Sequence, residues 1–163
     1  MAISGVGNEY DVTLKAGASC KTSTSQYLCV GAGWTTTSTD WTALLTNDST
    51  TGGTINAHAF IGVNQTGAMS AGSENMKVRM IGISKVKCAT SIQAWSWVEC
   101  YNGISTTTFR GHIQQLVAGE TFTAMTTSAW RVPVGRALES GSTNSVISVF
   151  ILPSLYEGNL IEH

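Results

Sequence analysis

Charged residues are scarce in this chain. Asp, Glu, Lys and Arg make up 12% of its 163 residues, against about 25% in ordinary soluble domains. The formal net charge of -1 supplies no basic surface for a nucleic acid, and no acidic block suggests a solvating tail. A surface with so few charges must be covered by Thr, Ser, Gly and Asn, or be buried against partner molecules.

Long hydrophobic runs are also absent. The opening MAISGVGNEY has no basic region followed by an apolar stretch, and no run approaches the length of a membrane helix. We therefore expect a protein that is made and used in a cytoplasm, or released from it by lysis. Without a secretion signal or a CxxC spacing, reduced thiols are favoured over disulfides or a metal site for Cys20, Cys29, Cys88 and Cys100.

Sequence motifs of catalysis are missing as well. The chain contains no nucleotide-binding P-loop, no GxGxxG unit, no HExxH and no GxSxG. His58 lies in an apolar strand pattern, where a structural role is the commoner one. The acidic residues are scattered, and their spacing does not establish the pair of carboxylates, about 5 to 10 Å apart, that a glycosidase needs. We expect no catalytic residue, no cofactor and no metal.

The most strongly patterned stretch is residues 75–101. Apolar and polar side chains alternate from Met76 onward, which predicts a half-buried strand. Gly82 interrupts this strand, and a lone glycine in a strand often marks a bulge or a bend. The strand is expected to resume over residues 83–88 and to be followed by a turn.

Residues 92–101 are expected to form the next strand, with small apolar residues on one face. The other face carries Trp95, Trp97 and Tyr101. This aromatic face has two interpretations. It packs within or between subunits, where aromatic rings bury large areas, or it stacks on a sugar while Gln93 and Glu99 supply polar contacts. Packing is the favoured interpretation.

Further strands are predicted between turn-forming residues, at 10–15, 26–31, 54–64, 131–139 and 145–152. The last two should form a closing hairpin. Its final strand should be central, because Ile147, Val149 and Ile151 give it one wholly apolar face. A long Thr-, Ser- and Gly-rich excursion at residues 33–53 could hold a further hairpin, and residues 108–127 fit either a short helical turn or a strand. The short strands and the lack of a long helical period indicate an all-β barrel or sandwich.

The order of these blocks resembles the small capsid decoration proteins of tailed bacteriophages, also called cement or head-stabilising proteins. The resemblance runs from about residue 15 to 153 and is clearest in FIGV at 60–63, in residues 78–98 and in residues 134–152. The chain departs from the compact form of that family by greater length at residues 33–53, at residues 104–130 and in the C-terminal tail.

The sequence pattern predicts a single β domain at residues 10–153, between an N-terminal arm (1–9) and a C-terminal tail (154–163). The resemblance implies that this domain is a small antiparallel β-barrel-like (β-tulip-type) fold or a sandwich. It implies a homotrimer without an active site, seated outside the phage shell where three copies of the major capsid protein meet. Such a protein binds only the assembled shell and so stabilises it against internal DNA pressure. Neither a nucleic acid nor a membrane is expected as a partner.

The candidate contacts with other subunits or with the shell are large apolar side chains of the 92–101 strand, of the last strand and of the C-terminal tail. An apolar terminus calls for a partner surface, because idle termini are usually polar. The C-terminal tail either docks on a neighbouring subunit or on the shell, or it folds back on its own barrel. The alternative function, a carbohydrate-binding module or adhesin, uses the aromatic face alone. The candidate contact residues are Trp95, Trp97, Tyr101, Phe150, Leu155, Tyr156, Leu160 and Ile161.

Overall fold

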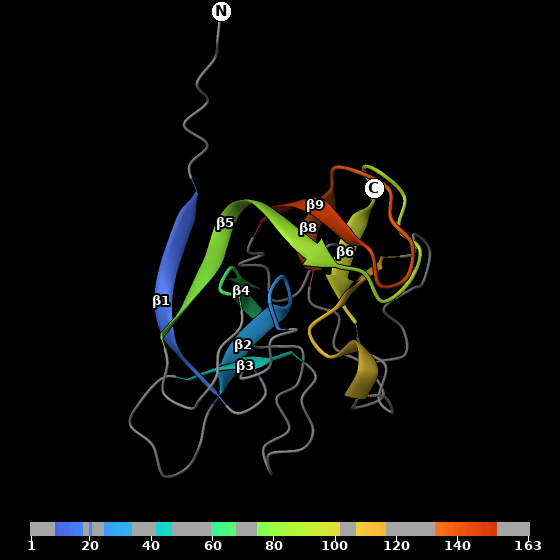
Figure 1. Ribbon diagram of the computed structural model, residues 1–163. Helices are drawn as coiled ribbons and strands as arrows, with labels where there is room; N and C mark the ends of the chain where they lie inside the picture. Colours follow the sequence, from blue (N-terminus) through green and yellow to red (C-terminus); the bar gives the residue numbers. More distant parts are fainter. Residues whose placement is uncertain are drawn as a thin grey trace, which may run out of the picture.

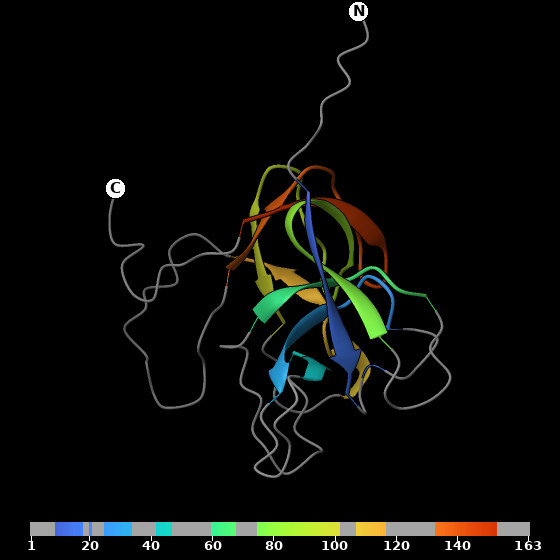
Figure 2. The same cartoon turned by 90° about the vertical axis from the view of Figure 1, so that its left-hand side faces the viewer.

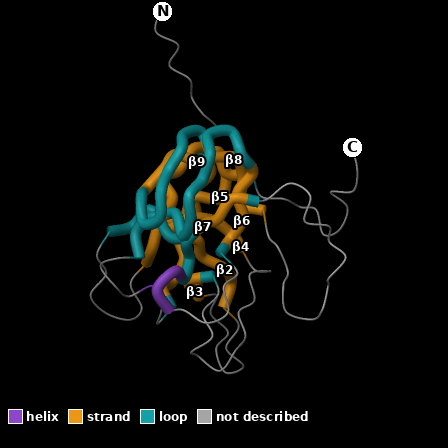
Figure 3. The backbone as a smooth tube through the Cα atoms, turned by 90° about the vertical axis from the view of Figure 1, so that its right-hand side faces the viewer, coloured by secondary structure: helices purple, strands orange, loops and turns teal. Residues whose placement is uncertain are grey.

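The protein is described by a computed structural model that places residues 9–17, 20, 25–33, 42–46, 60–67, 75–101, 107–116 and 133–152. Within these residues it is all-β, as expected, with no α-helix and one short 3-10 turn (Figures 1 and 3). The elements are β1 (Tyr10–Ala16), β2 (Cys29–Gly33), β3 (Thr42–Leu45), β4 (Phe60–Asn64), β5 (Asn75–Lys87), β6 (Trp97–Cys100), η3 (Thr107–Phe109), β7 (Ile113–Gln115), β8 (Pro133–Ala137) and β9 (Val146–Ile151).

The first half of the long strand β5 belongs to a closed ring of five strands, which we call ring A. The strands follow one another in the order β1-β3-β2-β4-β5, and β5 pairs again with β1. All of these pairings are antiparallel except that of β1 with β3, in which Lys15 pairs with Thr42 in parallel. Figure 2 shows β1 crossing in front of the other strands of this ring.

The second half of β5 starts another set of five strands, ring B, in the antiparallel order β5-β9-β8-β6-β7. The set is nearly closed as well. Cys88, just after β5, forms a parallel bridge with Ile113 of β7, and the amide of Ala89 donates to the carbonyl of Ile113 at 2.7 Å. The expected barrel-like fold is therefore confirmed, in the form of two rings that share one strand.

Gly82 is the point at which β5 passes from ring A to ring B. Ile81 still pairs with Tyr10 of β1, whereas Gly82 pairs with Ile151 of β9. Gly82 has φ 107°, a backbone conformation that residues with a Cβ rarely adopt. The predicted bend is confirmed by this φ and by the change of pairing partner at Gly82, and Figure 1 shows that β5 is strongly curved.

The described residues form two apolar cores, and the alternation of β5 contributes to both. The core within ring B also takes in Cys29 of β2 and Val63 of β4 from ring A. Met76 and Val78 point into the core of ring A, and Val86 points into that of ring B. The core of ring B also holds Ile147, Val149 and Ile151, the apolar face that the sequence predicted for the central last strand. The four cysteines, all among the described residues, are buried and form no disulfide.

The closing hairpin of β8 and β9 and the central position of β9, between β5 and β8, are confirmed. Part of the long 33–53 excursion does form a hairpin, because β3 pairs antiparallel with β2. Of the ambiguous stretch 108–127 the structure describes residues 108–116, in which the short 3-10 turn η3 ends at Phe109 and the strand β7 follows at Ile113–Gln115.

Two strand boundaries were predicted too early. β2 starts at Cys29, because Tyr27 has φ 65° and lies in a turn. β6 covers only Trp97–Cys100, because Trp95, with φ 66°, lies in a turn that precedes it. The predicted strand start at 54–59, the arm before Glu9 and the tail after Leu152 lie outside the described residues.

We predict that Gly82→Ala lowers the free energy of unfolding by about 1 to 3 kcal/mol, because alanine is strained at this positive φ. Urea denaturation followed by circular dichroism measures the effect. Gly67→Ala is the matched control: its φ is not positive, and an added Cβ would meet only Gln26 Oε1, at 3.9 Å. Equal stability losses in the two variants would contradict the strain at Gly82.

Candidate functional site

The outer face of ring B carries a row of exposed side chains that crosses four strands. Ile83 of β5 lies opposite Phe150 of β9, Phe150 lies opposite Arg136 of β8, and Arg136 lies opposite Trp97 of β6. Side chains directly opposite each other in antiparallel strands have their Cβ atoms about 5 Å apart on the same face. The four side chains therefore form one continuous row.

Further apolar side chains extend this row where β5 bends. Ile81 is two residues before Ile83 and pairs with Tyr10 of β1, and Leu152 is two residues after Phe150. Large apolar side chains are between 38% and 58% exposed at all of these positions. We call them the outer apolar band: Tyr10, Ile81, Ile83, Trp97, Phe150 and Leu152.

Arg136 is the one charged residue within the row. Its guanidinium carbon lies 5.0 Å from the centre of the Trp97 ring, a cation–π contact that holds both side chains on the surface. Among the described residues, the structure gives this guanidinium no carboxylate partner. The row therefore combines apolar area with one positive charge that is available to a partner.

A polar row borders the band along β5 and β9. Lys85 Nζ donates to Glu139 at 2.9 Å and to Ser148 Oγ at 2.8 Å. These groups lower the pKa of the exposed Glu139 carboxyl to about 2, chiefly through the hydrogen bond from Lys85 and then through those from Ser148. The apolar surface thus ends at a line of satisfied polar groups.

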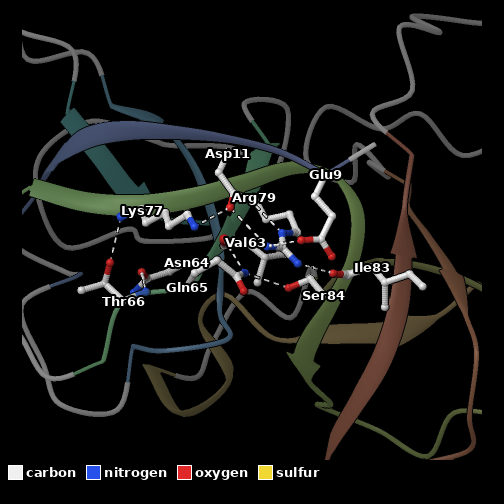
Figure 4. Close-up of polar contacts among 10 residues, drawn as sticks. All are labelled: Glu9, Asp11, Val63, Asn64, Gln65, Thr66, Lys77, Arg79, Ile83 and Ser84. Atoms are coloured by element: carbon white, nitrogen blue, oxygen red, sulfur yellow. Dashed lines mark hydrogen bonds and ion pairs between the residues drawn. The ribbon is translucent and has the colours of Figure 1, made fainter. Parts of the chain in front are cut away.

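Arg79 fixes the bend of β5 beneath the band (Figure 4). Its Nε and Nη2 donate to the two carboxylate oxygens of Asp11, at 2.9 and 3.2 Å, and Nη2 also lies 2.8 Å from Glu9. Its Nη1 donates to the carbonyl oxygen of Ile83 at 2.6 Å, one residue beyond Gly82. One side chain thus joins the start of β1 to the bend, and so positions the band residues on both strands.

Asp11 is the most strongly perturbed carboxyl of this cluster. The Arg79 hydrogen bond, aided by Lys77 Nζ at 2.8 Å, lowers the pKa of Asp11 from 3.8 to about 2 despite the opposing effect of burial. The same pairing raises the pKa of Arg79. Both groups are therefore charged at neutral pH.

The end of β4 is joined to β5 by amide side chains, also drawn in Figure 4. Gln65 Nε2 donates to Ser84 Oγ at 2.8 Å and to the carbonyl of Val63 at 3.0 Å. Asn64 Oδ1 accepts the amide of Thr66 at 2.8 Å. The bond from Gln65 to Ser84 joins this segment to β5, and the other two bonds order the chain at the end of β4.

Two of the eight contact residues expected from the sequence, Trp97 and Phe150, lie on the band. Trp95 is 66% exposed on the turn before β6. Tyr101 is half-buried and meets the ring of Phe109 edge-on at 5.5 Å. The other four lie outside the described residues: Leu155, Tyr156, Leu160 and Ile161.

The expectation of one shared aromatic face is wrong for this segment. The turn at Trp95 breaks the alternation, and β6 is too short to carry three aromatic residues in register. Trp95 and Trp97 are not buried within the chain. Glu99, expected beside the aromatic rings as a sugar contact, is 1% exposed and accepts a 2.6 Å hydrogen bond from Gln114 Nε2.

Sequence reasoning missed the band as a surface. Ile81, Ile83 and Arg136 were not singled out, although the isoleucines on the polar side of the β5 alternation were a usable signal. An apolar residue at a position where the strand otherwise places Lys and Arg indicates an exposed contact.

His112 offers no convergent polar site. Its side chain is largely buried, its Nδ1 lies 3.0 Å from the carbonyl oxygen of Arg110, and the Phe109 ring meets it edge-on at 5.5 Å. Burial lowers the pKa of His112. His58 lies outside the described residues.

The described residues contain no group of three or more His, Cys, Asp or Glu side chains arranged to hold a metal ion. No helix among them is long and apolar enough to cross a membrane. No family model, curated protein or solved structure matches the chain.

Asp11→Asn should remove a stabilisation of about 1 to 2 kcal/mol at neutral pH. The folded-state pKa of Asp11 is depressed, so this stabilisation is present above pH 4 and is lost as the pH falls from about 4 toward 2. Urea denaturation from pH 7 to 2 should show the wild-type and variant curves converging in that window. Glu9→Gln, which changes the 46% exposed partner of the same guanidinium, should cost less than about 0.5 kcal/mol. A constant gap between wild type and Asp11→Asn would contradict the assignment.

Trp95→Ala should change the unfolding free energy of the isolated chain by no more than about 0.5 kcal/mol, because the ring is mostly exposed. Ile92→Ala, three residues earlier at a 2% exposed position, should cost about 2 to 5 kcal/mol. Chemical denaturation of dilute protein compares the two variants. A loss of several kcal/mol at Trp95 would show that the ring is buried in solution.

Proposed function

We propose that this chain is a structural protein of a phage particle: a capsid decoration protein that binds the outside of the assembled shell as a homotrimer. The observation that carries the proposal is the outer apolar band. It is a surface suited to permanent contact with another protein, and it extends across the strands of ring B.

The size of the band supports a binding role. Large side chains that are roughly half exposed offer about 100 Å² each, so the band presents roughly 600 Å². That is at the upper end of the apolar patches found on monomeric proteins, and it approaches the roughly 800 Å² that each partner contributes to a standard interface.

The sequence blocks that resemble the decoration family are the blocks that build this surface. Residues 60–63 lie in β4, residues 78–98 include most of β5 and the start of β6, and residues 134–152 include most of β8 and all of β9. All band residues except Tyr10 lie within the second and third blocks. The resemblance and the exposed apolar surface therefore concern the same strands.

Energetics favour an oligomer over single copies. Burying roughly 600 Å² of apolar surface gives a gross gain of about 15 kcal/mol, and association costs about 4 to 15 kcal/mol. One such contact is therefore weak or moderate. Three such contacts between copies can close a ring of three chains, and the trimer gains from effective concentration when it engages the shell at three points. By binding only the assembled shell, the trimer opposes the disruption of the shell.

The test is co-sedimentation of the purified chain with heads of the phage that encodes it, stripped of their decoration. We expect saturable binding, and particles that resist heat better when they are decorated. Ile83→Ser combined with Phe150→Ser should reduce occupancy at least tenfold. Val146→Ser, on the same strand as Phe150 and equally exposed at 38%, is the matched control. Absence of wild-type binding would refute the proposal.

A carbohydrate-binding module is the alternative, and the exposure of Trp95 and Trp97 favours it. Aromatic rings that solvent can reach are able to stack on sugar faces. A glycan array probed with the wild type and with Trp95→Ala decides between the two functions. Specific glycan binding that is lost in the variant, together with no binding to heads, would establish the alternative.

A further inference from the structure

In the part of the chain that the structure describes, the strands leave no open edge through which copies could pair. Each described strand has a neighbour on both sides: ring A is closed by β1, and ring B by the bridge between Cys88 and Ile113. Addition of a strand from another chain, which needs a free edge, is therefore disfavoured. A contact between copies has to use an exposed face, and the outer apolar band is the apolar part of that face.

A cyclic trimer also needs two different surfaces on every copy. Contact of one patch with the same patch on a second copy produces a two-fold dimer, whereas a closed ring of three is built from a patch that meets a different, complementary patch. The band is one such surface. The complementary surface has to be apolar and has to carry an acidic side chain that can pair with the guanidinium of Arg136.

Residues 153–163 have this composition. The segment PSLYEGNLIEH contains two acidic residues, Glu157 and Glu162, and no Lys or Arg. Its apolar residues would fill the band, and a carboxylate would reach the guanidinium of Arg136, for which the described residues provide no acidic partner. The apolar residues of the segment are Leu155, Tyr156, Leu160 and Ile161.

Residues 153–163 begin at the outer apolar band, from which they could extend to a neighbouring copy. The segment follows Leu152, which is itself a band residue at the end of β9. Eleven residues can extend by about 36 Å, roughly the diameter of a domain of this size. The segment is therefore long enough to leave its own chain and lie on the next.

We propose that the outer apolar band binds residues 153–163 of a neighbouring copy of this chain, and that three such exchanged segments close the homotrimer. This inference rests on the proposed function, from which the homotrimer comes. It adds the identity of the two surfaces and the role of Arg136 as the cation that receives an acidic side chain of the segment.

A photoreactive benzoylphenylalanine at position 150 of the full chain tests the contact. An equimolar mixture of isotopically heavy and light chains is irradiated, and cross-linked peptides are identified by mass spectrometry. We expect position 150 of one isotopic form to be joined to residues 153–163 of the other. Cross-links to that segment only within one chain, or none to it, would overturn the inference.

Charge exchange in the full chain is the second test. Arg136→Glu should raise the protein concentration at which the trimer dissociates at least tenfold, and so should Glu157→Arg combined with Glu162→Arg. All three changes in one chain should restore assembly. Thr90→Glu, which adds an acidic side chain at an exposed position outside the band, should leave the trimer intact.

Light scattering of the wild type distinguishes failure of the exchanged segment from failure of the proposed homotrimer. A trimeric wild type whose triple-charge variant is not restored contradicts the exchanged segment and leaves the proposed function standing. A wild type that stays monomeric at all concentrations contradicts both.

Discussion

The fold depends on one strand serving two rings. β5 pairs with β1 and β4 in its first half and with β9 in its second, and the change of partner is possible because Gly82 adopts a positive φ. Arg79 then locks the bend by binding Asp11 on one side and the carbonyl of Ile83 on the other. Ile81 and Ile83 lie on either side of Gly82, and both side chains are exposed. The bend that joins the two rings therefore also positions these two residues of the outer apolar band.

Local patterns predicted the strands well where one sequence segment decided the outcome. The alternation from Met76 predicted β5, and the lone Gly82 predicted its bend. The apolar face of Ile147, Val149 and Ile151 predicted that β9 is central. Local patterns could not predict the parallel pairing of β1 with β3, because no local signal specifies which distant strands pair. The shortness of β6 follows from a left-handed conformation at Trp95, a residue type that rarely adopts it.

The candidate surface was only partly accessible from the sequence. Trp97 and Phe150 were identified as large apolar residues, but their membership of one row depends on three separate registers, β5 with β9, β9 with β8 and β8 with β6. Arg136 becomes part of the surface only through those registers. The low charge content of the chain agrees with this surface, because a chain with few charged residues carries an exposed apolar band.

The proposed function requires that the outer apolar band is covered by another chain once the protein has assembled. Hydroxyl-radical footprinting read by mass spectrometry measures this directly, by comparing side-chain oxidation in dilute chain with that in decorated particles. The account predicts strong protection of Trp97, Ile83 and Phe150 in the particle, and little change at Val146, which is equally exposed in the isolated chain. Oxidation of the band residues to the same extent in both samples would contradict it.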